Sequence, residues 1–446
     1  MTAMSEARWR RAERKRAPER ELVVLVRVLL LFESSLYSAV TPVLPHYAHT
    51  LGASKPAVGV LAASYSAGLI PGSLLGGWIA ARAGVRRTTI LGLVLFAAAV
   101  AAFGFGTSLV TLDLLRVVQG IACGGIWGGA LTWVIAATPR ERRGAVLGSV
   151  IGAAIFGTLV GPLLGILAVA AGTELVFALV GGISLALALW VRAHAEPAPE
   201  SSGERGAPER TAVTRRNLLG KLRSSPGLGL GAWLITLEAI TIGATSALLP
   251  LRLSRLGASG IAIGATFVLA SGLSTLLAPI VGRLTDRRGA RVPIIVGLVC
   301  AAALIGLLPA PQSWPVLAAL SVIALGGPLT TCMIPAVSIM TMSAERAGMA
   351  LLLATTTVNL AYATGETIGA PVAASLSQAT SDTVPLLGLS GLMLLTLWPV
   401  IAARLDRSPP PPAPPERTPS SPPRPAPPER APSSPEPSLL PLLETR

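Results

Sequence analysis

Charged side chains are scarce in this sequence of 446 residues. Asp, Glu, Lys and Arg together make up 13% of the residues, whereas a soluble domain carries about 25%. Aromatic residues are also few, at 4%, while 52% of the residues are hydrophobic. This lack of charge excludes an ordinary soluble domain and indicates that lipid is the solvent for most of the chain.

Cysteine and histidine, which often bind metals or act in catalysis, number only 3 each. Cys123, Cys300 and Cys332 lie within apolar runs and lack metal-ligand spacing, so we interpret them as small core residues. The sequence also contains no phosphate-binding P-loop and no HExxH motif. We therefore predict no enzymatic activity, no ATP-hydrolysing site, no cofactor and no metal site.

What the sequence does contain is a series of apolar runs. Each is roughly 18–25 residues long, which is enough for a helix to cross a bilayer core of about 30 Å. We place them at 22–46, 57–81, 88–107, 110–137, 145–170, 173–192, 227–250, 261–281, 292–310, 313–339, 349–376 and 384–403. The predicted fold class is therefore an all-α integral membrane protein with about 12 transmembrane helices.

Polar segments divide these runs into two sets. We predict a cytoplasmic N-terminal tail at 1–21, six-helix bundles at 22–192 and 227–403, and a cytoplasmic linker at 193–226. Residues 404–446 are rich in Pro, Ser, Arg and Glu, so we predict a disordered cytoplasmic tail there. No signal-peptide cleavage site follows the first twenty residues, and we expect the first helix to stay in the mature protein.

The net charge of +14 could suggest a nucleic-acid partner, but the placement of the arginines does not. They cluster in alternate loops, as in cytoplasmic loops that face anionic lipid. The clusters are Arg82, Arg86 and Arg87; Arg140, Arg142 and Arg143; the linker; Arg283, Arg287, Arg288 and Arg291; and Arg346. We predict no nucleic-acid binding, a location in the cell (plasma or inner) membrane, and both termini in the cytoplasm.

An offset of 205 residues relates the beginnings of the two halves. The aligned pairs are Glu33 with Glu238, Pro45 with Pro250, Leu51–Ser54 with Leu256–Ser259, Gly59 with Gly264, Gly77 with Gly282, Arg82 with Arg287, Gly84 with Gly289 and Arg86 with Arg291. Acids, a proline and loop arginines share this register. We therefore predict two halves related by pseudo-two-fold symmetry, with a substrate site between them near the bilayer midplane.

Several motifs resemble those of the major facilitator superfamily. The loops Gly77–Arg87 and Gly282–Arg291 resemble its signature between the second and third helices, and Arg116-x-x-Gln119-Gly120 resembles its fourth-helix motif. The fifth-helix motif of its antiporter branch is resembled by Gly157, Gly161, Pro162 and Gly165. The resemblance extends over about 22–403 and implies a major facilitator fold of the twelve-helix drug:proton antiporter (efflux) branch.

The resemblance also implies roles for the loop residues. It assigns gating to Gly77, Arg82, Gly84, Arg86, Gly282, Asp286, Arg287, Gly289 and Arg291. The first loop departs from the family pattern because it has Ala81 where the family has Asp. The resemblance implies that in the family this carboxylate binds near the start of the eleventh helix. Asp286 would keep the equivalent role in the second half, so we expect the halves to gate unequally.

The fifth predicted helix carries a glycine pattern of its own. Gly157, Gly161 and Gly165 lie on one helical face, which allows another helix to approach closely. Pro162 cannot donate to the carbonyl of Thr158, which weakens the helix at that point. We predict a closely packed, bendable seam, although ordinary tight packing would leave the same pattern.

Few ionisable residues lie inside the predicted spans. Glu33 and Glu238 each lie about eleven residues into their helices, where a charge costs about 2.5–3.5 kcal/mol on insertion scales. We predict proton coupling through Glu33 and Glu238; the alternative is a permanently paired or protonated acid. The resemblance makes Arg116 a modulator of the Glu33 carboxylate, unless its side chain snorkels to the surface. Glu366 and Asn359 are candidates for a third polar element of the cavity.

The leading hypothesis is a proton-coupled exporter of small hydrophobic or cationic molecules that works by alternating access as a monomer. Its partners would be a small-molecule substrate, protons and the lipid bilayer. A second hypothesis is an importer or uniporter of a polar metabolite such as a sugar, although 4% aromatic residues argue against a sugar site. A third is a membrane scaffold or receptor whose proline-rich tail docks a partner. Deleting the tail should abolish docking but leave transport intact, which distinguishes the third hypothesis from the other two.

Overall fold

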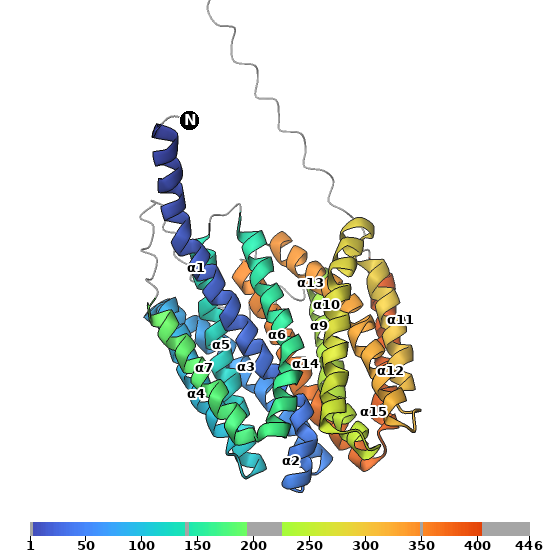
Figure 1. The fold of residues 1–446 in the computed structure, drawn as a ribbon. Coiled ribbons are helices and arrows are strands. Elements are labelled where there is room, and N and C mark those ends of the chain that lie inside the picture. The colour runs from blue at the N-terminus through green and yellow to red at the C-terminus, as the bar shows by residue number, and fades with distance from the viewer. Residues whose placement is uncertain (1–2, 139–141, 194–224, 348–350, 404–446) are drawn as a thin grey trace, which may run out of the picture. The chain divides into compact units, whose positions relative to one another are not determined.

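The computed structural model describes residues 3–138, 142–193, 225–347 and 351–403, and the regular elements in these ranges are helices (Figure 1). The first half comprises α1 (Ala3–Ala39), η1 (Thr41–Val43), α2 (Leu44–Thr50), α3 (Lys55–Ala83), α4 (Val85–Gly104), α5 (Leu109–Ala137), α6 (Arg143–Ala171) and α7 (Thr173–Ala193). The second half comprises α9 (Pro226–Arg255), α10 (Gly260–Arg288), α11 (Arg291–Leu307), α12 (Trp314–Gly326), α13 (Pro328–Arg346), α14 (Leu351–Ala379) and α15 (Thr383–Ala402).

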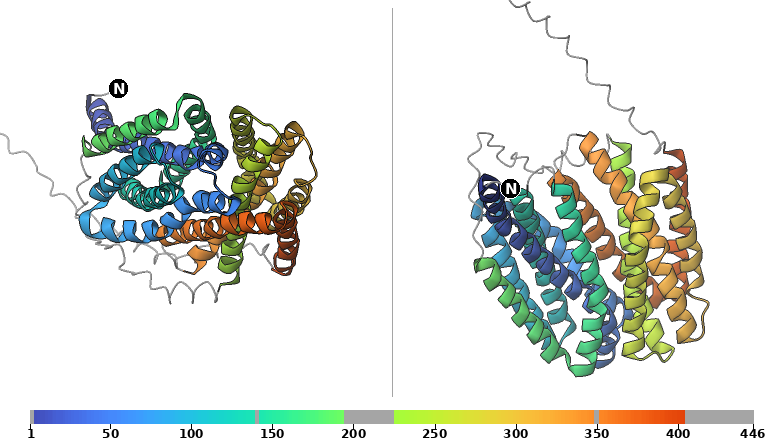
Figure 2. Two further views of the ribbon diagram at one scale, coloured as in Figure 1. Left: turned by 90° about the horizontal axis from the view of Figure 1, so that it is seen from below. Right: turned by 45° about the horizontal axis from the view of Figure 1, so that its top comes forward.

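Ten helical spans are long and apolar enough to cross a membrane. Two of the twelve predicted runs fall short of this measure. α11 has only 17 residues, and α14, although 29 residues long, carries polar side chains that include Asn359, Tyr362 and Glu366. All twelve predicted runs nevertheless coincide with helices, and the predicted all-α fold of two six-helix bundles is confirmed (Figure 2).

The predicted segment boundaries differ from the structure in three places. α1 begins at Ala3, so helix extends through most of the predicted tail at 1–21. The run at 22–46 is divided into α1, η1 and α2, because Pro42 and Pro45 lack the N–H that a continuous helix would use. The run at 313–339 is divided into α12 and α13 at Gly327, directly before Pro328. The predicted tail at 404–446, and all but the edges of the linker at 193–226, lie outside the described residues.

The repeat extends to the ends of the helices. α3 and α10 are both 29 residues long, and their bounds differ by the same 205-residue offset. Each follows a serine N-cap, Ser54 or Ser259, whose hydroxyl accepts a backbone N–H three residues on. Each ends at a glycine with positive φ, 88° at Gly84 and 78° at Gly289, a conformation that other residues rarely adopt. Local sequence therefore sets both ends of this helix in both halves.

Each half packs around its own hydrophobic core. In the first half, α3 and α5 approach closely along a ladder of glycines. A Cβ added to one of these glycines would overlap the backbone of the facing helix; they are Gly68, Gly72, Gly76, Gly120 and Gly124. Small residues at such an interface let two backbones come together and gain van der Waals contact, which drives helix association in lipid.

Replacing Gly124 with alanine is expected to destabilise the protein, because its Cβ would overlap the backbone at Gly72. Overpacking of this kind costs about 1–3 kcal/mol, more than the roughly 1 kcal/mol that alanine gains in a helix. Gly182→Ala in α7 is the matched control, since a Cβ there meets no atom within 4 Å. Thermal unfolding in detergent should give a lower Tm for Gly124→Ala only; equal Tm values would contradict the packing.

The two halves contact each other mainly through α3 with α14 and α6 with α10, with η1 and α2 packing against α9. Along α3, Lys55 bonds to Asp382, and Gly59 packs against Ala374. Beyond Ser66 the glycine ladder faces α5 instead. These contacts hold the halves together at the end of the bundle where α3 begins, which we call the Lys55 end. The loops with Gly84 and Gly289 lie at the opposite end.

Candidate functional site: a cavity between the halves

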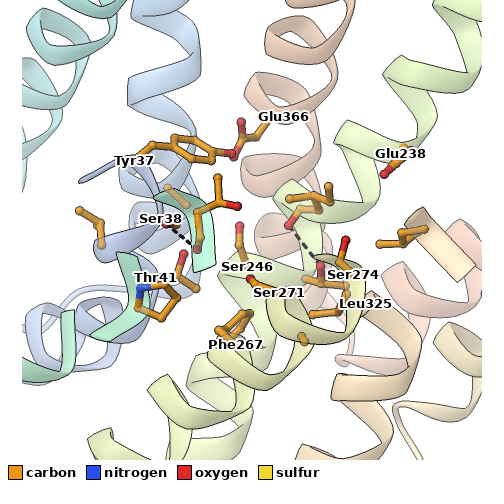
Figure 3. Close-up of a pocket in the computed structure, with 18 of the residues that line it drawn as sticks. Tyr37, Ser38, Thr41, Glu238, Ser246, Phe267, Ser271, Ser274, Leu325 and Glu366 are labelled. Carbon is orange, nitrogen blue, oxygen red and sulfur yellow. Dashed lines mark hydrogen bonds between the residues drawn. The ribbon is translucent and has the colours of Figure 1, made fainter. Parts of the chain in front are cut away.

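A cavity of about 240 Å³ lies between the two halves. The first half contributes α1, η1, α2, α3, α5 and α6 to its wall, and the second half contributes α9, α10, α12, α13 and α14. Of the five residues predicted for the cavity, Arg116, Glu238 and Glu366 line it. Figure 3 shows Glu366 and Glu238 on the α14 and α9 side and Tyr37 opposite Glu366. Glu33 and Asn359 are not among the lining residues.

Glu366 is hydrogen-bonded across the boundary between the halves. Its Oε1 accepts from the hydroxyl of Tyr37 in α1, and its Oε2 accepts from the hydroxyl of Ser66 in α3. The hydroxyls of Tyr37 and Tyr362 lie 3.3 Å apart, so the same point joins α1, α3 and α14. Because Glu366 is buried and both its oxygens are bound by the opposite half, its protonation state and the contact between the halves must affect each other.

Glu238 has a different environment. It lies on α9, is only 6% exposed and lines the cavity. Its Oε2 has no hydrogen-bond partner among the described residues. A buried carboxylate oxygen without a donor is costly, so a ligand that donates to this atom would remove that cost.

Glu33 lies behind the wall of the cavity. Its carboxylate accepts hydrogen bonds from the hydroxyl of Tyr65 and from Nε1 of Trp127, the latter at 2.7 Å. Glu33 and Glu238 are therefore equivalent in the repeat but not in their surroundings. Glu33 is satisfied within the first half, whereas Glu238 faces the cavity. The repeat alone gave no indication of this difference, because the residues around each carboxylate come from other helices.

Arg116 connects Glu33 to the cavity. Its guanidinium is buried, donates to Oε1 of Gln119 at 3.2 Å, and lies 4.7 Å from the centroid of the Tyr65 ring. Tyr65 in turn bonds to Glu33. The charge of Arg116 is close enough to interact with both Glu33 and Glu366. Burial inside the bundle rules out snorkelling to the surface for this side chain.

Several site residues have no counterpart in the sequence predictions. Tyr37 lies one helical turn after Glu33, and Tyr362 one turn before Glu366, so the spacing of four could have identified them as neighbours of acids. No sequence signal connects Ser66 to Glu366, since they are 300 positions apart. Asn359 is half-buried in α14, two turns before Glu366.

The signature loops have closely similar geometry in the two halves. Arg86 donates to the backbone carbonyl of Arg192 near the end of α7, and Arg291 donates to that of Ile401 near the end of α15, at 2.8 Å. A cation at the C-terminus of a helix satisfies free carbonyls and the helix dipole. These two arginines therefore bind the loop to the last helix of their own half.

The other loop residues lie at the surface. The guanidinium of Arg82 is 3.8 Å from the Trp78 ring, and Arg287 and Asp286 are exposed. Gly77 and Gly282 face open space. The partner predicted for Asp286 is the start of the fifth predicted helix, which is α6 and begins at Arg143; residues 139–141 before it and the side chains of 143–145 lie outside the described residues.

The glycines of the fifth-helix motif pack α6 against α1. A Cβ at Gly157, Gly161 or Gly165 would overlap backbone atoms of α1 or the residues beside them. Pro162, which directly follows Gly161, lines the cavity. The predicted close packing is present, and it lies between two helices of the same half, next to the cavity.

An ionic cluster joins the halves at the Lys55 end. Nζ of Lys55 lies 2.7 Å from Oδ1 of Asp382, Arg255 pairs with the other carboxylate oxygen, and the hydroxyl of Ser377 also donates to Asp382. Burial by itself raises the pKa of Asp382, but the hydrogen bonds from Lys55 and Ser377 and the charge of Arg255 outweigh it and lower the pKa. A lowered pKa means that the stabilisation is lost only as the pH falls below the usual Asp value of about 3.9, so the cluster stays ionised at neutral pH.

Comparison with known proteins identifies relatives of the chain. It is 29% identical over 284 residues to a chloramphenicol resistance protein of Streptomyces lividans, covering 62% of this chain and 67% of that protein. It is 27% identical over 238 residues to the uncharacterized MFS-type transporter YcaD of Escherichia coli, covering 52% and 58%. The MFS-type transporter ppzB of Metarhizium rileyi is 30% identical over 132 residues, which cover 29% and 27%. The chain thus spans less than two thirds of two of these three relatives.

Solved structures show the same fold. A bacterial homolog of the human lysosomal transporter Spinster, in an inward-facing and unoccupied conformation, superposes with a TM-score of 0.67 at 15% identity, over 86% of this chain and 95% of that one. The nucleoside transporter NupG gives 0.67 at 11% identity, over 85% and 99%. The sequence model described as Major Facilitator Superfamily matches residues 28–366. The chain therefore belongs to the Major Facilitator Superfamily and is a multi-pass membrane transporter.

Proposed function

We propose that this protein is a proton-coupled exporter of small molecules that works by alternating access. The observation that carries the proposal is Glu366, which lines the cavity while both its oxygens bind hydroxyls of the opposite half. A proton exchanged at this carboxylate would change the contact between the halves. The similarity to a chloramphenicol resistance protein and the glycine-proline motif in α6 support export.

The arginine-rich loops indicate the orientation. Loops that carry Arg82, Arg86 and Arg291 face the cytoplasm under the positive-inside rule, so the Lys55 end would face outward. In the present conformation the halves meet at that end through α3 and α14. The conformation is then the one that is closed toward the outside. Opening it requires the contacts of Lys55 and Glu366 with the opposite half to break.

Three acids and one arginine would take part in coupled transport. Glu366 would exchange its proton as the halves separate, and Glu33 would act as a second proton site that Tyr65 connects to Arg116. Arg116 would favour the ionised form of both acids by its charge. Glu238, with its free oxygen, would face the substrate. Small hydrophobic or cationic molecules are the proposed substrates.

Proteoliposomes with an acidic lumen test the proposal, with ethidium as a cationic probe and chloramphenicol as a neutral one. We expect at least one probe to accumulate in the lumen and to dissipate the pH gradient as it enters. Empty liposomes are the control. Probe entry that only equalises the concentrations on the two sides, and is unchanged when a protonophore collapses the gradient, would instead indicate a uniporter. Probe movement down its own gradient that draws protons in the same direction would indicate an importer.

The importer of a polar metabolite remains the second candidate because the cavity wall is rich in hydroxyl groups. Eleven of its 24 lining residues are Ser, Thr or Tyr, an unusual number for a site that binds only apolar molecules. The direction of accumulation in the same proteoliposomes distinguishes this function from export.

A further inference from the structure

Most of the hydroxyl groups of the cavity wall are used as donors toward the protein itself. On α9, Thr245 donates to the carbonyl of Thr241 at 2.7 Å and Ser246 to that of Gly243 at 2.9 Å. On α10, Thr275 donates to the carbonyl of Ser271 at 2.8 Å. A hydroxyl has one hydrogen and two lone pairs, so each of these groups offers the cavity only acceptor sites.

The same holds on the wall between α10 and α13. Thr330 donates to the carbonyl of Gly326 at 3.1 Å, and the Ser274 hydroxyl bonds to the Thr330 oxygen. Because the hydrogen of Thr330 is already used, Ser274 is the donor in that pair. On the first half, Ser38 donates to the carbonyl of Thr158 at 3.1 Å. Figure 3 shows Ser38, Ser246 and Ser274 around one space.

Glu238 adds charge to this ring of acceptors. Its Oε2 is buried and lacks a donor among the described residues. Apart from two tyrosines, the ionisable side chains that line the cavity are the carboxylates of Glu238 and Glu366 and the Arg116 guanidinium, which leaves one negative charge in excess when these three are ionised. Glu366 already accepts two hydroxyls. The excess charge therefore lies at Glu238.

We propose that the cavity is a site for a compact organic monocation rich in N–H and O–H donors, whose ammonium group binds Glu238 and whose other donors bind Thr245, Ser246 and Ser274. This rests on the proposed transport function and specifies its substrate class. A lipophilic cation without hydrogens on nitrogen would neutralise the charge but leave the acceptors unpaired, which is costly in a buried site. The volume of about 240 Å³ is below the roughly 300–1,000 Å³ of drug-sized pockets, which also favours a compact ligand.

Four probes of similar size separate charge from donor content. Glucamine, the primary amine of sorbitol, has both; sorbitol has donors without charge; tetraethylammonium has charge without donors; gluconate has the opposite charge. Calorimetric titration of the full-length protein in detergent at neutral pH should show glucamine binding at least about tenfold more tightly than the other three, the ratio expected for one charge-assisted hydrogen bond.

Two variants locate the ligand. Glu238→Gln should weaken glucamine binding at least about tenfold. Ser246→Ala, which leaves every charge in place, should weaken glucamine by a smaller factor and leave tetraethylammonium unchanged. Glu174→Gln, on the exposed start of α7, is the control for loss of an acid elsewhere. Monodisperse elution and an unchanged Tm establish that each variant is folded, and a misfolded Glu238→Gln is replaced by Glu238→Asp, which should weaken glucamine while retaining its preference over sorbitol.

The inference is overturned if tetraethylammonium binds as tightly as glucamine, or if glucamine binds Glu238→Gln as tightly as the unchanged protein. Proton-driven transport of ethidium with no glucamine binding would contradict this substrate class and leave the proposed function intact. Glucamine binding that depends on Glu238, in a protein that shows no proton-driven transport, would support the site and contradict the proposed coupling.

Discussion

Replacing Glu366 with glutamine is expected to lower proton-driven accumulation of the transported probe at least about tenfold, since hydrogen bonds to a charged group are worth roughly 1.5–3 kcal/mol. Glutamine cannot release or bind a proton at this position. It also presents an NH₂ group where one carboxylate oxygen accepts, so either Tyr37 or Ser66 loses its acceptor. The same change therefore removes the proton site and half of the bonding between the halves.

Two measurements in proteoliposomes separate these consequences. Accumulation driven by an acidic lumen requires proton exchange, whereas exchange of labelled for unlabelled probe at equal pH requires only alternation of the halves. We expect Glu366→Gln to lose the first and keep a substantial part of the second. Tyr37→Phe and Ser66→Ala, which keep the carboxylate but remove one donor each, should alter the exchange rate and retain proton coupling.

Glu174→Gln provides the matched control, because it removes an exposed acid of the same type from the start of α7. It should behave like the unchanged protein in both measurements. Glu33→Gln is expected to reduce accumulation as well, since Glu33 is the second proposed proton site. If Glu366→Gln accumulated probe at the full rate under a pH gradient, coupling through Glu366 would be disproved.

Cross-linking the Lys55 end is expected to reduce transport to the level of empty liposomes. Lys55 and Asp382 belong to opposite halves and their charged groups are 2.7 Å apart. The double variant Lys55→Cys, Asp382→Cys places thiols at both sites. A short bifunctional methanethiosulfonate reagent then links the two thiols and spans the distance that the lysine side chain covered. In alternating access this end must open once per cycle, so a covalent link at this place stops every cycle.

The design needs few changes to the chain. Cys300 is exposed and is replaced by serine, while Cys123 and Cys332 are buried and can stay. Each single cysteine variant treated with the same reagent is a control and should transport normally, although Lys55→Cys loses one ion pair and Asp382→Cys loses its pairs with both Lys55 and Arg255. Ion pairs near the protein surface contribute about 0–1 kcal/mol each, so the untreated double variant should also remain active.

Reduction provides the decisive comparison. Adding dithiothreitol to the cross-linked sample should restore transport, because it cleaves the link and leaves the fold unchanged. Full transport by protein whose cross-linking is complete on a gel would show that the Lys55 end does not open during the cycle. That outcome would contradict alternating access about this contact.

The sequence by itself determined most of the fold. Hydropathy located all twelve helical runs, because a span must satisfy its backbone internally and expose apolar side chains to lipid. The 205-residue register identified the equivalent helices α3 and α10, whose serine caps and terminal glycines are local features. Proline also accounts for the two runs that were predicted as single helices, since Pro42, Pro45 and Pro328 interrupt them where the structure divides the helix.

The functional assignments divide in the same way. The sequence identified Glu33, Arg116, Glu238 and Glu366 as rare ionisable groups within apolar runs, and this follows from the cost of charge in lipid. Only the tertiary structure decided which of them share a cavity. It placed Glu33 behind Tyr65 and left Oε2 of Glu238 without a hydrogen-bond partner among the residues that the structure describes, although the repeat makes the two acids equivalent. A side chain's partners come from helices far away in the sequence, and the 3.6-residue period of one helix carries no information about which helix packs against it.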